Sequence, residues 1–422
     1  MNVAEQKRNV PKILSLHVLN KLLKIPKKIS NTNKDNCHNL IFYPPVKDMR
    51  IMADLLNRIS WYLPRISKLG LNVKVASNIK VDKFNISFLE KHLENHYNSY
   101  FKEDVLNAIN IVHDEFNQQL RSSDMILVWD KSALFQVNII KNLSKVYIVD
   151  PTFYSHTESS MYREINYNLL PKKEKNQNIN IYIERYQNLK QIATNFRDAT
   201  VFGSGPSLEK SVNHDFSESF TIVCNSIVKN KTLLEHIKPN VIVFGDPVLH
   251  FSISNYSEEF RKHLVDAVKK YGAYCLVPEN SADLIAMNMP DIADYIIGVP
   301  TNAKDITFLT PHNFKVKSSS NILTLLMLPI ASGLFDTINI IGSDGRNKNE
   351  KTFWQHSKAS QFNELMESVY KSHPSFFRDR IYTDYYKRHV NYLESLMVIG
   401  EQRGKKYHSL EFSHIKSLQE RR

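Results

Sequence analysis

The chain has 422 residues, of which 42% are hydrophobic and 23% are charged. This length and apolar content suffice for a large core divided over two or three domains. The formal net charge of +12 indicates attraction to an anionic partner such as a membrane surface, a nucleotide or an acidic glycan. The positive charge is dispersed and the sequence has no pattern of a DNA- or RNA-binding module, so we expect no nucleic-acid partner.

Cysteine usage and hydropathy indicate the compartment. Cys37, Cys224 and Cys275 lie far apart, without the spacing of a metal site, and the last two stand in apolar runs that predict buried free thiols. The sequence has neither a secretory leader pattern nor an uncharged apolar run of the roughly 18 residues that span a bilayer. We therefore expect a cytoplasmic protein, with a place at the inner face of the membrane as the alternative.

Residues 1–36 form a basic segment that we expect to be partly mobile. Within it, residues 13–23 place isoleucine, leucine and valine near helical spacing, with lysines at both ends. This pattern is typical of an amphipathic helix on anionic lipid, and equally of a surface helix packed on a domain. Peripheral membrane contact through this basic N-terminus is therefore one of two interpretations.

Residues 37–160 predict a first α/β domain, because short runs rich in β-formers alternate with helical stretches. Asp130 and Asp150 follow two of these runs, at the place where open sheets bind ligands, although aspartate caps a turn there more often. The predicted strands are 39–45, 72–77, 125–130 and 145–151, and the predicted helices are 48–69 and 84–122.

A polar connector is predicted over 161–196, with a helix at 181–194, before a second α/β domain over 197–412 and a basic tail over 413–422. The fold class expected is thus α/β, with two Rossmann-like parallel-sheet units and a helical C-terminal part. In the second unit the predicted strands are 199–205, 220–226, 241–247, 273–279 and 337–344, with a last short one at Tyr407-His408; the predicted helices are 257–271, 321–333 and much of 359–400.

The stretch "VFGSGPSLEKSV" opens the second unit with an apolar strand, a turn and a helix-like segment. The turn Gly203-Ser204-Gly205-Pro206-Ser207 has two interpretations. One is a tight strand-to-helix connection. The other is a phosphate site, in which backbone N–H groups at a helix N-terminus hold the anion of a nucleotide.

Polar residues also follow the next two predicted strands. Asn225 ends the second and Asp246 the third, so that with the serines after the first strand they are expected to converge at one sheet edge. Further on, Ser319, Ser320 and Asn321 precede a long apolar helix whose N-terminus suits a phosphate or carboxylate, or is simply capped by these side chains.

The motifs "VFGSGPSL", "VCNSI", "FGDPVLHF", "KSSSNILTLLMLPIASGLFDTINIIGSDGR" and "FWQHS" together resemble, in order and spacing, the bacterial sialyltransferases of glycosyltransferase family 42. They also resemble the related motility-accessory-factor and pterin-pyrophosphokinase-like proteins. The resemblance covers about residues 197–412. It implies a glycosyltransferase that moves a sialic-acid-like sugar from a CMP-activated donor to a glycan or glycolipid acceptor with inversion, without a metal ion or further cofactor.

The resemblance also assigns residues. It implies nucleotide binding by Gly203, Ser204, Gly205, Pro206, Ser207, Asn225, Asp246, Ser319, Ser320, Asn321 and Asp344. Asp246 stands where the family has asparagine, and a carboxylate beside an anionic donor puts the donor's identity in doubt. For the catalytic base or leaving-group stabiliser we favour His356. Asp384 and His389 come next, in the segment that matches the region of the family's catalytic histidine; His389 lies within a helical pattern and is equally interpreted as a surface histidine.

The sequence is also compatible with three other functions. They are a transferase for another nucleotide sugar, a pterin-pyrophosphokinase-like enzyme whose Mg²⁺ would need carboxylates such as Asp246 and Asp344, and a non-catalytic glycan-binding protein.

Overall fold

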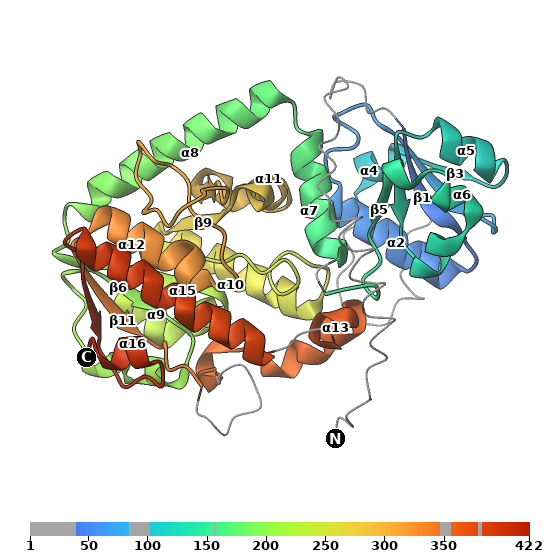
Figure 1. Ribbon diagram of the computed structural model, residues 1–422. Coiled ribbons are helices and arrows are strands. Elements are labelled where there is room, and N and C mark those ends of the chain that lie inside the picture. The colour runs from blue at the N-terminus through green and yellow to red at the C-terminus, as the bar shows by residue number, and fades with distance from the viewer. Residues whose placement is uncertain (1–38, 84–101, 156, 347–355, 379–381) are drawn as a thin grey trace, which may run out of the picture.

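The computed structural model describes residues 39–83, 102–155, 157–346, 356–378 and 382–422. The basic segment 1–36, Cys37 and residues 84–101 of the predicted helix 84–122 lie outside them. The chain is an α/β protein with a five-stranded and a seven-stranded sheet. All strand pairs within both sheets are parallel, as predicted. Figure 1 shows the smaller unit, in blue and teal, beside the larger one, in green to red.

The smaller sheet has the strand order β3-β2-β1-β4-β5. Its central strands are buried on both faces, which is typical of a parallel sheet covered by helices. The bounds are β1 Asn39–Val46, β2 Asn72–Ser77, β3 Ile109–Val112, β4 Met125–Val128 and β5 Val146–Ile148, with helices α2 Met49–Tyr62, α4 Glu103–Asn107, α5 Phe116–Ser122 and α6 Val137–Ile140.

The prediction of one helix over 84–122 is wrong in its described part. Strand β3 interrupts it, with α4 before and α5 after. The run "INIV" is only four residues long, and its pairing with β2 decides its conformation. Likewise α2 ends at Tyr62 instead of reaching residue 69.

Asp130 and Asp150 cap turns. The Asp130 carboxylate accepts a hydrogen bond from the Ser132 backbone N–H at 2.9 Å. The Asp150 carboxylate accepts from the N–H groups of Lys131 and Thr152, both at 2.6 Å. Their role is therefore to hold the chain after β4 and β5.

The larger sheet has the strand order β10-β9-β8-β7-β6-β11-β12. The predicted strands are confirmed with shorter ends, and the short strand at Tyr407-His408 is confirmed as β12; β10 was not predicted. The bounds are β6 Asp198–Phe202, β7 Ser219–Cys224, β8 Val241–Val243, β9 Tyr274–Pro278, β10 Ile296–Val299, β11 Thr337–Ile341 and β12 Lys406–Ser409.

The predicted polar connector 161–196 is almost entirely helical, in α7 (Thr157–Leu169) and α8 (Lys172–Ala193). In α8 a stripe of Tyr182, Tyr186 and Leu189 is buried among polar residues. The Tyr186 hydroxyl donates to the Leu309 carbonyl at 2.7 Å. The predicted helix 181–194 lies within α8 as far as Ala193. The helix begins earlier than predicted, because so narrow a buried stripe leaves the segment polar on average.

The other helices lie in the larger unit, where α10 confirms the predicted helix 257–271. The predicted basic tail 413–422 packs on the larger unit, since Ile415 and Leu418 are buried and Arg421 pairs with Glu401 at 2.6 Å.

Within the described part of the chain, no helix is long and apolar enough to cross a bilayer. The bounds are α9 Lys231–Ile237, α10 Asn255–Tyr271, α11 Glu279–Asn288, α12 Leu328–Leu334, α13 Met366–Ser372, α14 Ser375–Arg378, α15 Tyr382–Gln402 and α16 Lys416–Gln419.

The cores of the two units are in contact. Ile253 and Leu284 of the larger unit are buried among the core residues of the smaller one. The Trp61 indole N–H donates to the Phe251 carbonyl at 2.7 Å. The Arg65 guanidinium holds the Asp283 carboxylate with two of its nitrogens. The two units therefore form a single packed body.

Candidate functional site

The strand order of the larger sheet has a topological switch point. From β6 the chain adds β7, β8, β9 and β10 on one side, and then returns to place β11 on the other side of β6. In open parallel sheets, ligands bind beyond the carboxyl ends of the strands at such a reversal, because the loops diverge there and leave a crevice. The turns after β6 and β11 are therefore the expected place for a site.

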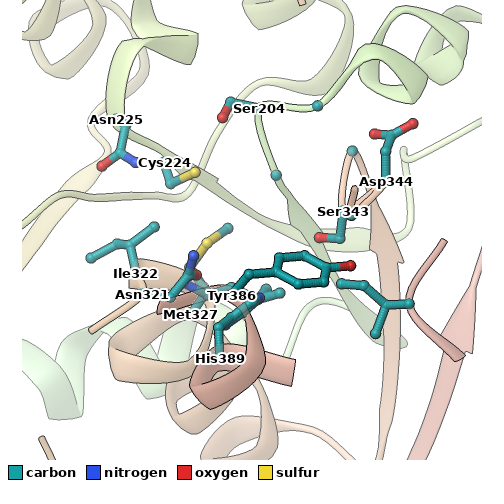
Figure 2. Close-up of a pocket in the computed structure, with 16 residues that line it drawn as sticks. Ser204, Cys224, Asn225, Asn321, Ile322, Met327, Ser343, Asp344, Tyr386 and His389 are labelled. Carbon is teal, nitrogen blue, oxygen red and sulfur yellow. The ribbon is translucent and has the colours of Figure 1, made fainter. Parts of the chain in front are cut away.

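A pocket lies at this place. It has a volume of about 530 Å³, including the part open to solvent. Figure 2 shows Ser204 and Asn225 on one side of it and Tyr386 and His389 on the opposite side. It is lined by Gly203, Ser204, Gly205, Cys224, Asn225, Asn321, Ile322, Leu323, Met327, Gly342, Ser343, Asp344, Gly345, Tyr386, His389 and Ile415.

Half of the residues predicted for the site meet in this pocket. Those that line it are Gly203, Ser204, Gly205, Asn225, Asn321, Asp344 and His389; those that do not are Pro206, Ser207, Asp246, Ser319, Ser320, His356 and Asp384.

Glycine is required after β6 because two turns touch there. A Cβ on Gly203 would stand 2.4 Å from the Gly342 carbonyl oxygen, and one on Gly205 would stand 2.2 Å from an oxygen of Asp344. The N–H groups of Gly203 and Gly205 donate to the carbonyls of Ile341 and Gly342, both at 2.8 Å. Close packing of the turns after β6 and β11 thus accounts for these glycines.

Asp344 occupies the helix start at which we expected a phosphate. The helix is a 3₁₀ helix, η4 (Pro206–Asn213), and the Ser207 N–H donates to the Asp344 carboxylate at 3.0 Å. The Ser207 hydroxyl donates to it as well, at 2.9 Å. Burial raises the pKa of Asp344 above the usual aspartate value. A phosphate in the pocket would have to bind beside this carboxylate.

Asn225 follows β7 directly and adopts a left-handed backbone conformation, with φ of +51°. A residue with a side chain rarely does so, although asparagine tolerates it better than most. The short 3₁₀ helix η5 (Asn225–Lys229) begins here, so the residue turns the chain away from the sheet at the pocket wall.

The serine-rich segment before the apolar helix is bonded internally. The Ser319 hydroxyl lies 2.9 Å from that of Thr324, and the Ser320 carbonyl accepts from the Tyr385 hydroxyl. The Asn321 side chain caps the helix start by accepting from the Leu323 N–H at 2.9 Å. Of this group, only Asn321 reaches the pocket.

The predicted helix 321–333 is not a uniform α-helix. Its first part, η7 (Leu323–Met327), is a π-helix in which the Leu328 N–H donates to the Leu323 carbonyl, and α12 follows. Pro329 gives the reason: it has no N–H for the preceding turn and its ring crowds the carbonyl four residues back, so the helix widens there. Leu323 and Met327 of this wide turn line the pocket.

Helix α15 contributes Tyr386 and His389, three residues apart and hence on one helix face. His389 is 4% exposed, and burial lowers its pKa to about 4. The sequence left open that His389 is a surface residue, which is wrong. The Tyr386 hydroxyl accepts a hydrogen bond from the Arg346 N–H at 3.1 Å. Tyr386 was not predicted as a site residue, although its spacing of three residues from His389 places both on one face of a helix.

The other two catalytic candidates lie beside the pocket. The His356 Nδ1 is 2.9 Å from the Ser204 hydroxyl, which joins two predicted residues. Measured over the whole residue, His356 is exposed to solvent. Its imidazole ring is nevertheless surrounded by protein atoms, and this burial lowers its pKa to about 4. Asp384 is exposed on the first turn of α15.

Asp246 does not reach the pocket. Strand β8 ends at Val243, and three residues later the Asp246 carboxylate accepts from the N–H groups of Val248 and Leu249, at 2.8 and 2.9 Å. Of the polar residues predicted to converge after three strands, Ser204 and Asn225 therefore line the pocket and Asp246 does not. Among the described residues, no group of three or more histidine, cysteine or acidic side chains is arranged to hold a metal ion.

Comparison with known proteins gave no match to any family model, curated protein or solved structure. The resemblance to the family 42 sialyltransferases therefore depends on the quoted motifs alone, and the donor remains a prediction.

Proposed function

We propose that this protein is a glycosyltransferase of the family 42 type, which transfers a sialic-acid-like sugar from a CMP-activated donor to a glycan acceptor with inversion. The observation that carries the proposal is the single pocket at the switch point of the larger sheet. Residues of three separate quoted motifs line it together: Gly203, Asn225, and Asn321 with Asp344. Their meeting supports the reading of those motifs as one nucleotide site.

The lining residues suit a nucleotide. The Asp344 carboxylate lies where it could accept a hydrogen bond from a ribose hydroxyl or a base amino group. The side chains of Ser204, Asn225 and Asn321 add neutral donors and acceptors, and Ile322 and Met327 supply apolar surface for a base.

The charge of the pocket favours a donor of low negative charge. Among the lining residues that the structure describes there is neither lysine nor arginine, so a phosphate there would depend on their amide, hydroxyl and imidazole groups. The Arg346 guanidinium lies nearby, 5.8 Å from the centre of the Tyr386 ring. A CMP-activated sialic-acid-like sugar carries one phosphodiester charge and one carboxylate charge, fewer than a nucleoside triphosphate, and fits this environment better.

His389 is our first candidate for the base that acts on the acceptor hydroxyl, because it lines the pocket and its buried imidazole, whose pKa is lowered, is neutral near pH 7. To the Tyr386 hydroxyl, on the same helix face, we assign the stabilisation of the departing phosphate, because Tyr386 also lines the pocket. His356, through Ser204, is the second candidate for the base.

A nucleotide panel tests the donor. We expect the melting temperature of the full chain to rise with CMP, without a need for Mg²⁺, and to rise less with UDP or ATP. A larger shift with UDP would assign another nucleotide sugar. A shift confined to ATP with Mg²⁺ would instead favour pyrophosphokinase-like chemistry, and no shift with any nucleotide would contradict the proposal.

Variants test the base. We expect His389→Ala to lower the rate of sugar transfer from a CMP-sugar by about 100- to 10,000-fold while CMP affinity changes far less. His408→Ala, which removes an exposed histidine on β12, is the matched control. If His356→Ala or Asp384→Ala is inactive and His389→Ala retains activity, the base is one of those residues instead.

A further inference from the structure

Exposed apolar side chains gather on one short part of the smaller unit. Over the described residues, nine large hydrophobic side chains are exposed, and four of them fall within residues 135–143. They are Phe135, 77% exposed, Val137, 62%, Ile140, 50%, and Leu143, 37%. Scattered single exposed residues need no explanation, but a group of this kind indicates an interaction site.

The segment that carries them is firmly attached to the sheet. It comprises η2 (Lys131–Phe135), α6 and η3 (Leu143–Lys145). Ala133, Leu134 and Ile139 point inward and are buried in the core on that side of the sheet. The Tyr43 hydroxyl of β1 donates to the Gln136 side chain at 2.8 Å. The outward apolar residues are therefore held on the surface by a well-packed inner face.

The same segment is basic. Residues 131–149 contain three lysines, Lys131, Lys141 and Lys145, and no aspartate or glutamate. Arg121 on the adjacent helix α5 is exposed, and its carbonyl accepts a hydrogen bond from Lys145 at 2.8 Å. Positive charge thus accompanies the apolar group.

The position of this surface leaves it accessible. Figure 1 shows α5 and α6 on the side of the smaller sheet that faces away from the larger unit. A flat partner could therefore approach it without meeting the unit that holds the pocket.

We propose that this apolar-basic surface, formed by Phe135, Val137, Ile140 and Leu143 with the three lysines, docks on an anionic lipid bilayer. The apolar side chains enter the interface between headgroups and acyl chains, while the lysines remain at the level of the lipid phosphates. Each basic group near an anionic membrane surface adds attraction that salt weakens. This inference depends on the surface alone and not on the proposed transferase activity.

Vesicle sedimentation with the full chain tests the proposal. We expect binding to vesicles of phosphatidylcholine with phosphatidylglycerol, and much weaker binding to phosphatidylcholine alone or at high salt. Phe135→Asp/Val137→Asp should weaken binding to the anionic vesicles by about tenfold or more. Val212→Asp, at a side chain 63% exposed on the larger unit, is the matched control and should bind like the wild type.

The basic part is tested by Lys131→Gln/Lys141→Gln/Lys145→Gln, which should bind anionic vesicles about tenfold more weakly or worse while melting at the wild-type temperature. Residues 1–38 are the same in all these proteins, so a difference between them reports this surface. Wild-type affinity in the Phe135→Asp/Val137→Asp variant would overturn the proposal. So would a wild type that ignores vesicles but forms a dimer which this variant dissociates, since the surface would then bind a second copy.

Discussion

At the scale of single residues, the turn after β6 shows how one motif admits two explanations. The glycines that suggest a phosphate loop are needed because the Gly342 carbonyl approaches them closely. The helix start that suggests an anion site already binds an anion, the carboxylate of Asp344. A substitution at Gly205 would therefore disturb Asp344 first, and loss of nucleotide binding in such a variant would not by itself identify a phosphate site.

Buried histidines predict acid sensitivity. Burial lowers the pKa of His250 and His389 to about 4, from an ordinary value of 6.5 in the unfolded chain. Their folded pKa is depressed, so below pH 6.5 the unfolded chain binds more protons, and stability is lost as pH falls from 6.5 towards 4. We expect each to cost roughly 2–4 kcal/mol across this range, measured by urea unfolding at several pH values.

The control for this prediction is His250→Asn. The His250 Nδ1 accepts from the Asp246 N–H at 3.1 Å, a role that the asparagine oxygen can take over without titrating. The variant should lose less stability than the wild type between pH 6.5 and 4. An equal loss in both proteins would show that His250 does not carry the effect.

At the scale of elements, helix α7 joins parts of the chain that are distant in sequence. Its Glu158 is fully buried and pairs with Arg58 of α2. It also accepts from the Tyr62 hydroxyl at 3.2 Å and lies 3.3 Å from His373, just after α13. Burial raises the pKa of Glu158 to about 7, against the opposing effect of Arg58. A buried ion pair of this kind fixes the packing of three elements.

Breaking that pair should be costly. Glu158→Gln removes one of the two carboxylates that pair with Arg58 and leaves Asp54 at 2.9 Å, so we expect the free energy of unfolding to fall by about 1–3 kcal/mol in denaturant titrations. Arg58→Met/Glu158→Leu removes both charges and should recover most of the loss. Glu164→Gln, at an exposed position on the same helix, is the control and should change stability by about 0.5 kcal/mol or less. A similarly small effect of Glu158→Gln would show that the pair does not stabilise the fold.

At the scale of the whole molecule, the two sheets belong to one packed body. Because Ile253 and Leu284 complete the core of the smaller unit, that unit would expose apolar surface if the larger one unfolded first. We therefore expect a single cooperative heat-absorption peak in calorimetry, with equal calorimetric and van't Hoff enthalpies.

Leu284→Asp places a charge in the shared core and should split this peak or advance the melting of the smaller unit. Ile181→Asp, at an exposed position on α8, is the control and should leave one peak. Two separate peaks in the wild type would mean that the contact between the units is too weak to couple them.

The sequence by itself determined the class of fold and most of the sheet edge that bears the pocket. Continuous apolar runs such as "VIVF" and "MILV" can be recognised because strands in a covered parallel sheet are buried on both faces. Polar residues directly after them, such as Ser204, Asn225 and Asp344, follow from the same local pattern.

Only the tertiary structure decided which of those residues meet. The short strands β3 and β10 depend on their neighbours for pairing, and α8 depends on a narrow stripe of four buried residues. His389 and Tyr386 enter the pocket because α15 packs across the sheet from a point some 180 residues beyond Gly203. Asp344 reaches Ser207 only because β11 returns beside β6. Contacts between segments so far apart in the sequence depend on how the whole chain packs. A local sequence pattern carries no information about that packing.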